Sequence, residues 1–131
     1  MSNNMKLVQY FVDGFLNNNE TELSNLASPS FVYSLNHGDV IDFDKFIARM
    51  RFLNSATKFV NQEITSEDDA HFHFDFESIL PAPNEGVKSD GFAQIMVQNG
   101  LIIRVDIHYK GSEEDFQKFQ ELMKNTTTVL L

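Results

Sequence analysis

Hydrophobic residues recur at intervals of three and four along several stretches of the chain, and this spacing predicts four amphipathic helices. In the first, an apolar stripe ends at Leu16, and three consecutive asparagines follow it. Asp42 and Ser112 precede two later stripes and are suited to cap helices at those points. The predicted helices, counted from their caps where these exist, are Met5–Leu16, Glu20–Ala27, Asp42–Asn54 and Ser112–Asn125, followed by a short β-prone tail, Thr126–Leu131.

Elsewhere the hydrophobic pattern changes to a period of two, which predicts strands. The clearest alternation runs from Ala70 to Glu77, where three phenylalanines share one face and polar residues occupy the other. The pair Asn99 and Gly100 is a strong signal for a hairpin turn between the last two strands. The predicted strands are Ser30–Leu35, Lys58–Ser66, His71–Leu80, Lys88–Asn99 and Leu101–Lys110, with a longer connection at Pro81–Gly86.

Alternation along the last three predicted strands assigns their residues to two faces of a sheet. The apolar, inward face is expected to carry Phe72, Phe74, Phe76, Ala93, Ile95, Val97, Ile103, Val105, Ile107 and Tyr109. The polar, outward face is expected to carry His71, His73, Asp75, Glu77, Gln94, Arg104, Asp106 and His108.

The order of the predicted elements indicates the fold class. Three helices, with one strand between the second and the third, precede a run of antiparallel strands, and a fourth helix ends the chain. This order separates helices from sheet, which is typical of an α+β fold. The 131 residues suffice for one domain over residues 1–131.

Charge and composition limit the expected partners. Ten Lys and Arg stand against 19 Asp and Glu, which gives a net charge of −9. This charge repels phosphate backbones and anionic membrane surfaces, so we expect neither nucleic acid nor a membrane as partner. The chain has no cysteine, no apolar run near the roughly 20 residues of a membrane helix, and a polar start at Met1–Lys6. We therefore expect a cytoplasmic protein.

Phenylalanine is unusually frequent, with 13 residues in the chain. These rings either fill a core against the helices or line a cavity suited to a flat, apolar ligand of moderate size. The two interpretations are compatible, because a sheet that its own side chains do not fill leaves a pocket.

Several segments resemble the nuclear-transport-factor-2-like superfamily, which includes ketosteroid isomerases and SnoaL-like polyketide cyclases. The opening of the chain resembles theirs at Leu26–Tyr33, at His37 and Gly38, and in the helix around Phe46. The closing hairpin Ile95–Ile102, followed by Ile107–Tyr109, is also similar to theirs. The resemblance extends over nearly the whole chain.

The resemblance implies a strongly curved, mainly antiparallel sheet that wraps around the N-terminal helices as a cone with a pocket, plus a C-terminal helix. It also implies a small hydrophobic molecule as ligand, a homodimer through the outer sheet face, and no cofactor. The residues expected to line the pocket and bind the ligand are Tyr10, Phe11, Phe15, Phe46, Met50, Phe72, Phe74, Phe76, Ala93, Ile95 and Ile107.

The catalytic pattern of the ketosteroid isomerases, by contrast, is incomplete in this chain. Those enzymes use a carboxylate base, with a tyrosine and a protonated aspartate as oxyanion donors. The base position corresponds to Ser34 or Leu35, and the donor aspartate to Ala93. The donor tyrosine corresponds to Tyr10 or Phe11. Two function classes therefore stay open: cofactor-independent acid–base chemistry of the isomerase, cyclase or hydrolase kind, and a non-catalytic ligand-binding or assembly module.

Four residues are candidates for acid–base catalysis: His37, Asp39, Tyr33 and Tyr109. A histidine beside an aspartate can act as an oriented general base, although both are also ordinary residues of a solvated turn. An inward Tyr109 can donate a hydrogen bond to a ligand carbonyl or serve as a core aromatic.

A metal site is the remaining alternative. His71, His73 and Asp75 share one strand face, and imidazole is a common zinc ligand. His108 has the same polarity, but an intervening strand separates it from them by roughly 10 Å, twice the strand spacing. We therefore expect no bound metal, and a polar outer face or dimer interface instead.

Overall fold

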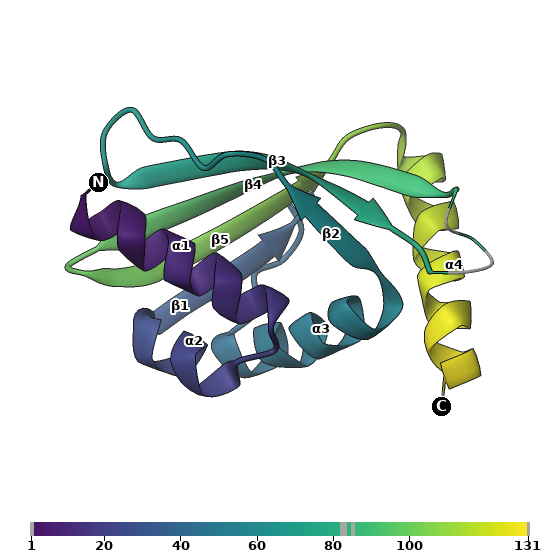
Figure 1. Ribbon diagram of the computed structural model, residues 1–131, viewed down its shortest axis with the longest axis horizontal. Helices are drawn as coiled ribbons and strands as arrows, with labels where there is room; N and C mark the ends of the chain where they lie inside the picture. The colour runs from purple at the N-terminus through teal and green to yellow at the C-terminus, as the bar shows by residue number, and fades with distance from the viewer. Residues whose placement is uncertain (1, 82–83, 85, 131) are drawn as a thin grey trace.

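The computed structural model describes residues 2–81, 84 and 86–130 and has the α+β organisation that the sequence predicts (Figure 1). Caps predicted at two helix starts are present: Asp42 Oδ1 accepts the Lys45 amide at 3.0 Å, and Ser112 Oγ accepts the Asp115 amide at 3.1 Å. The elements are α1 (Asn3–Leu16), α2 (Glu20–Leu26), β1 (Ala27–Leu35), α3 (Phe43–Ala56), β2 (Lys58–Asn61), β3 (His71–Ile79), β4 (Lys88–Gln98), β5 (Leu101–Tyr109) and α4 (Glu113–Leu130).

The strands form one sheet in the order β1-β5-β4-β3-β2. Neighbouring strands are antiparallel except for β1 and β5, which are parallel. The β4–β5 hairpin turns at Asn99 and Gly100, whose φ angles are 54° and 74°. Positive φ at both positions is the requirement of the tight hairpin turn that this residue pair predicts.

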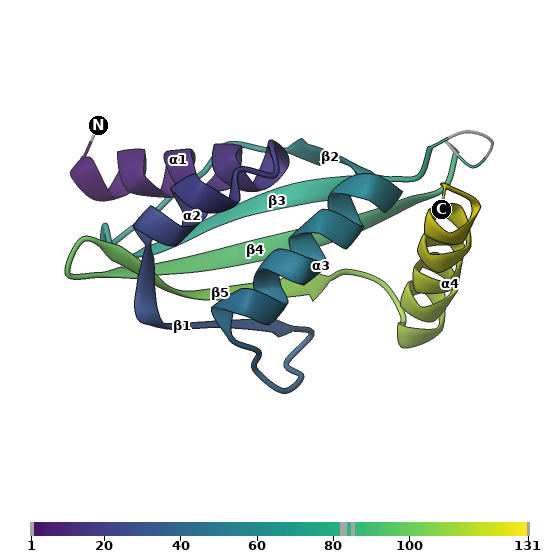
Figure 2. The same ribbon diagram turned by 90° about the horizontal axis from the view of Figure 1, so that it is seen from below.

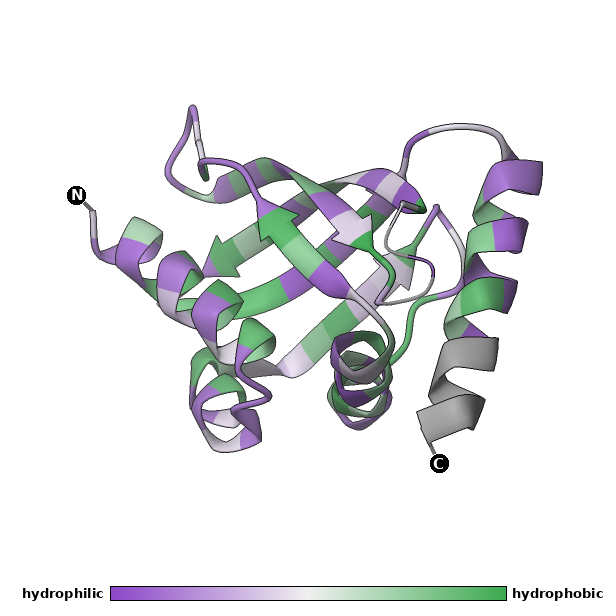
Figure 3. Cartoon of the chain, turned by 45° about the vertical axis from the view of Figure 1, so that its right-hand side comes forward, coloured by the Kyte–Doolittle hydropathy of each residue, from purple (hydrophilic) through white to green (hydrophobic). Residues whose placement is uncertain are grey.

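Helices α1, α2 and α3 lie on one face of the sheet, and α4 lies across its end (Figure 2). The strands alternate between hydrophobic and hydrophilic residues along their length (Figure 3). Phe72, Phe74 and Phe76 are buried between the sheet and the helices, as the alternation predicts. A second, smaller core joins α4 to the end of α3 and to Leu80; its buried residues are Leu53, Ala56, Leu80, Phe119 and Met123. No helix in the described residues is long and apolar enough to cross a membrane.

One inward assignment on β5 is wrong. The pairing of β4 with β5 shifts between Met96 and Val97, where the partners change from Arg104 to Ile102. Ile103 is thus an extra residue in β5, and Ile102, fully buried, takes the inward place. A β-bulge of this kind breaks strict alternation at a single position, which a period-two pattern does not reveal.

Some element boundaries also differ from the predictions. β2 ends at Asn61 rather than Ser66, and β1 begins at Ala27, so Pro29 lies in an edge strand, where a missing amide donor is tolerated. The backbone of α4 continues to Leu130 through the segment expected to be β-prone. Each β-branched residue reduces the stability of an already formed helix by well under about 1 kcal/mol, so the helix can continue through this segment. Three of the six residues of the predicted Pro81–Gly86 connection, at positions 82, 83 and 85, lie outside the described residues.

Candidate functional site

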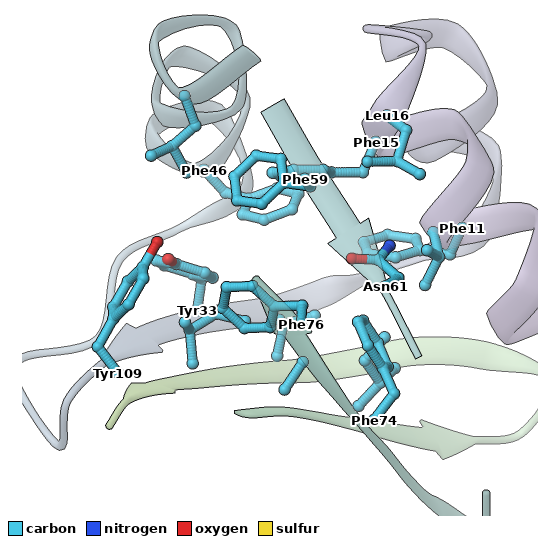
Figure 4. A pocket seen from close by; sticks show the side chains of 16 residues that line it. Phe11, Phe15, Leu16, Tyr33, Phe46, Phe59, Asn61, Phe74, Phe76 and Tyr109 are labelled. Atoms are coloured by element: carbon cyan, nitrogen blue, oxygen red, sulfur yellow. The ribbon is translucent and has the colours of Figure 1, made fainter. Parts of the chain in front are cut away.

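An apolar cavity of about 70 Å³ lies between α1, α3 and the inward face of the sheet (Figure 4). Its lining comes mostly from aromatic and branched aliphatic side chains. The lining residues are Phe11, Val12, Phe15, Leu16, Tyr33, Phe46, Leu53, Phe59, Asn61, Phe74, Phe76, Ala93, Ile95, Val105, Ile107 and Tyr109. This volume is about half that of an engineered apolar cavity of roughly 150 Å³ that binds benzene.

Phenylalanine rings keep the cavity small. The Phe46 ring of α3 lies with its centroid 5.9 Å from that of Phe11 and 5.8 Å from that of Phe15, both on α1. On the sheet side it lies 5.0 Å from Phe31 and 5.2 Å from Tyr33. These are ordinary separations for packed aromatic pairs. Much of the phenylalanine excess therefore fills the core, and a residual apolar space remains beside it.

The polar lining consists of Tyr33, Tyr109 and Asn61, and the described lining includes no Asp, Glu or His. Figure 4 shows Tyr33 and Tyr109 on one side of the cavity, with Phe11, Asn61 and Phe74 on the other. The cavity thus has a hydroxyl-bearing end and a largely apolar end.

Both tyrosines are held in their protonated form. Burial raises the pKa of Tyr33 to about 12, although the nearby charge of Arg49 and its hydrogen bond to the hydroxyl act in the opposite direction. Burial likewise raises the pKa of Tyr109, against a hydrogen bond with Ser78, whose Oγ lies 3.4 Å from the Tyr109 hydroxyl. At neutral pH both hydroxyls are therefore available as hydrogen-bond donors.

Arg49 of α3 lies near Tyr33, behind the cavity lining, and was not singled out from the sequence. Its Nε is buried and has no hydrogen-bond partner within the described part of the chain. Arg49 follows the buried Phe46 by three residues and precedes the buried Leu53 by four, so it lies on the inner side of α3. This spacing was the signal in the sequence that Arg49 faces inward. An arginine in a helix usually keeps its charged end in water and buries only its stem, so the spacing alone does not identify a site residue.

No family model and no curated protein sequence matches this chain. Solved structures do match it. A steroid delta-isomerase from Pseudomonas aeruginosa is similar over 99% of this chain and 95% of its own, with a TM-score of 0.76 at 11% identity. A candidate polyketide cyclase from Xanthomonas campestris pv. campestris covers 92% of this chain and 96% of its own, with a TM-score of 0.67 at 17% identity.

A third similar structure is a nuclear-transport-factor-2-like protein of unknown function from Cytophaga hutchinsonii. It covers 82% of this chain and 89% of its own, with a TM-score of 0.64 at 12% identity. The chain has the nuclear-transport-factor-2-like fold. At these identities the likeness establishes the fold that the sequence resemblance implied, and the site must be argued from this chain's own residues.

Within this fold, ten of the fifteen residues singled out from the sequence line the cavity. They are Phe11, Phe15, Tyr33, Phe46, Phe74, Phe76, Ala93, Ile95, Ile107 and Tyr109. Met50 and Phe72 are buried in the core outside the cavity lining, and Tyr10 is 55% exposed on α1.

The structure does not bring His37 and Asp39 to the cavity. Both are exposed in the turn after β1, where His37 has a φ of 61°. The His37 ring lies 4.4 Å from that of His108 on the outer side of the sheet. Turn geometry, which the sequence pattern does not specify, thus directs His37 away from the cavity.

The outer sheet face carries a row of rings and an ion pair. The ring centroid of Phe92 lies 6.4 Å from that of His108 and 5.8 Å from that of His73. Arg104 Nε contacts both Asp106 oxygens, at 2.9 and 3.0 Å, and Ser34 Oγ donates to the same carboxylate. Burial alone would raise the pKa of Asp106, but these hydrogen bonds outweigh it and lower the pKa.

The histidines of β3 and β5 are separated by β4, as the strand order requires. Among the described residues, no group of three or more His, Asp or Glu side chains is placed to hold a metal ion. His71 instead pairs with Asp68, whose Oδ2 lies 2.6 Å from its Nδ1.

Proposed function

We propose that this chain binds a small hydrophobic molecule in the cavity between α1, α3 and the sheet, and that binding rather than catalysis is its function. The observation that carries the proposal is the lining itself, which combines apolar side chains with three uncharged polar groups. Sites for small molecules are typically apolar clefts with a few placed polar groups. The enclosed volume suits a narrow aliphatic chain better than a flat ring system of moderate size.

The positions that correspond to the isomerase machinery support binding over proton abstraction. Ala93, which corresponds to the donor aspartate, lines the cavity with a methyl group and is 1% exposed. Ser34 is one of the two residues that correspond to the base. Its hydroxyl donates a hydrogen bond to the Asp106 carboxylate. Abstraction of a proton from carbon needs a base within hydrogen-bond reach of the substrate.

Acid–base chemistry of the isomerase, cyclase or hydrolase kind is the second candidate function. It is favoured by the two protonated tyrosines, Tyr33 and Tyr109, which can polarise a carbonyl group. In that case the base would come from the substrate or from water, and no cofactor is required. Loss of turnover of a conjugated ketone in Tyr109→Phe would support this candidate over the first.

We also propose a homodimer through the outer sheet face, in a cytoplasmic protein of one domain. The row of Phe92, His73 and His108 lies on the sheet face opposite the helices and supports such an interface. The net charge of −9 and the lack of cysteine support the cytoplasmic location. The ligand therefore enters from the helix side or from the end of the sheet, and the partner covers the other face.

The test of the binding proposal is calorimetric titration of the protein with 1-hexanol, a narrow neutral probe. We expect saturable binding to the wild type and at least tenfold weaker binding to Ala93→Leu, because the larger side chain occupies the cavity. Ala48→Leu places the same change on an exposed position of α3 and is the matched control. Equal binding by Ala93→Leu and the wild type would contradict the proposal, provided that both variants unfold cooperatively.

A further inference from the structure

We propose that the molecule bound in the cavity is a carboxylic acid, whose carboxylate is held by the hydroxyls of Tyr33 and Tyr109 with Arg49 as the counter-charge. This inference rests on the proposed function, since it names the chemical class of the ligand for the same cavity. It assigns a role to Arg49, which was not among the candidate residues of the sequence analysis.

Arg49 is the cation whose charge acts on both cavity tyrosines. The ion pairs among the described residues do not include it, and its Nε is buried without a partner. Arg51, two residues along the same helix, is paired with Glu20 at the surface. The Arg49 side chain is partly buried, and a cation withdrawn from water is normally paired or binds an anion. Arg49 is therefore suited to balance the charge of an anion bound nearby.

The directions of the hydrogen bonds leave the tyrosine protons free to face the cavity. Arginine has donors only, so the Tyr33 hydroxyl oxygen is the acceptor in its contact with Arg49. The Tyr33 proton then remains available to an acceptor in the cavity. Tyr109, whose hydroxyl lies 3.4 Å from Ser78 Oγ, has at most a weak bond there and can supply a second donor. Two donors supported by a positive charge are suited to the two oxygens of a carboxylate.

The cavity also differs in polarity along its length. The tyrosines lie at one side, while Phe11, Phe74 and the uncharged amide of Asn61 lie at the other (Figure 4). An amphipathic acid therefore has one orientation, with the carboxylate toward Tyr33 and Tyr109 and the hydrocarbon toward α1. The volume of about 70 Å³ limits the enclosed part to a short chain.

Arg49 itself is not among the lining residues, so it acts on the ligand through Tyr33 and through its charge. In a protein of net charge −9, an anion gains nothing from the overall field. Preference for an acid over its neutral analogue must then come from this local cation. That preference is the property to measure.

The experiment compares hexanoate with hexanamide, its neutral analogue of nearly the same size, by calorimetric titration at pH 7. We expect hexanoate to bind the wild type at least tenfold more tightly than hexanamide. In Arg49→Gln this difference is expected to disappear while hexanamide still binds, and in Arg49→Lys part of it should return. Arg51→Gln, which removes an exposed arginine from the same helix, is the matched control and should keep the full preference.

Equal affinities of the wild type for the two probes would overturn the carboxylate inference and leave the binding proposal standing. Binding of neither probe would overturn both. The acid–amide comparison in the wild type keeps the inference falsifiable if Arg49→Gln fails to fold. Persistence of the full preference in a folded Arg49→Gln protein would also overturn it.

Discussion

The ring of Phe76 occupies the space that a side chain on Gly91 would need. The two residues are directly paired across β3 and β4, and a methyl group built on Gly91 would lie 2.2 Å from Phe76 Cζ. The same ring lies 5.6 Å from Tyr109 and 5.9 Å from Phe59, measured between centroids. A glycine in the middle of a strand thus lets an aromatic ring pack onto the backbone and line the cavity.

Gly91→Ala is therefore expected to destabilise the protein by about 1–3 kcal/mol, because the Phe76 ring must leave its position in a packed core. Thermal or denaturant unfolding measures this change. Gly86→Ala is the matched control, since a methyl group there meets nothing within 4 Å. The control should change the free energy of unfolding by less than about 0.5 kcal/mol. Similar stabilities of the two variants would show that Phe76 does not pack on Gly91.

Tyr33 predicts a specific loss of stability in alkaline solution. An unfolded tyrosine ionises near its ordinary pKa of 10.0, whereas burial in the native state raises the pKa of Tyr33 to about 12. The native state therefore binds more protons in this range, and the stability contributed by Tyr33 is full below pH 10 and lost between pH 10 and 12. Tyr33→Phe should show a shallower decline of unfolding free energy over that interval in urea titrations.

The same substitution at the exposed Tyr10 is the control for this experiment. Part of the decline should remain in Tyr33→Phe, because burial raises the pKa of Tyr109 as well. Superimposable pH profiles for the wild type and Tyr33→Phe would refute a buried, protonated Tyr33.

The proposed dimer predicts the effect of a charge on the outer sheet face. Phe92 is only partly buried, and it lies between His73 and His108. Phe92→Glu places an unpaired carboxylate at the centre of this surface, so we expect the dimer to dissociate into monomers. Sedimentation equilibrium measures the result, and Tyr10→Glu on α1 should leave the dimer intact. A monomeric wild type, or a dimeric Phe92→Glu, would contradict the interface.

The parts of the fold that follow from local periodicity could be predicted from the sequence. Phe72, Phe74 and Phe76 lie inward because alternation in a strand is set by backbone geometry. Ile103 could not be placed, since a single extra residue in one strand depends on pairing with another. His37 is a similar case, because its place beside His108 depends on a turn with positive φ.

The apolar part of the candidate site and its two tyrosines, Tyr33 and Tyr109, could be predicted from the sequence, whereas Arg49 could not. The lining phenylalanines follow from the faces of α1, α3 and β3, which the hydrophobic pattern identifies. Arg49 does not follow from it, because whether an arginine at the edge of a stripe reaches solvent depends on what packs around it. The place of Arg49 beside the tyrosines is therefore set by tertiary packing.

The central claim, that a small hydrophobic molecule binds in this cavity, is tested most directly by NMR spectroscopy of labelled isoleucine methyl groups during titration with 1-hexanol. Ile95 and Ile107 line the cavity, whereas Ile79 and Ile103 do not. We predict that the methyl signals of Ile95 and Ile107 shift and saturate while those of Ile79 and Ile103 stay in place. Unchanged signals of Ile95 and Ile107 at saturating probe would contradict the account.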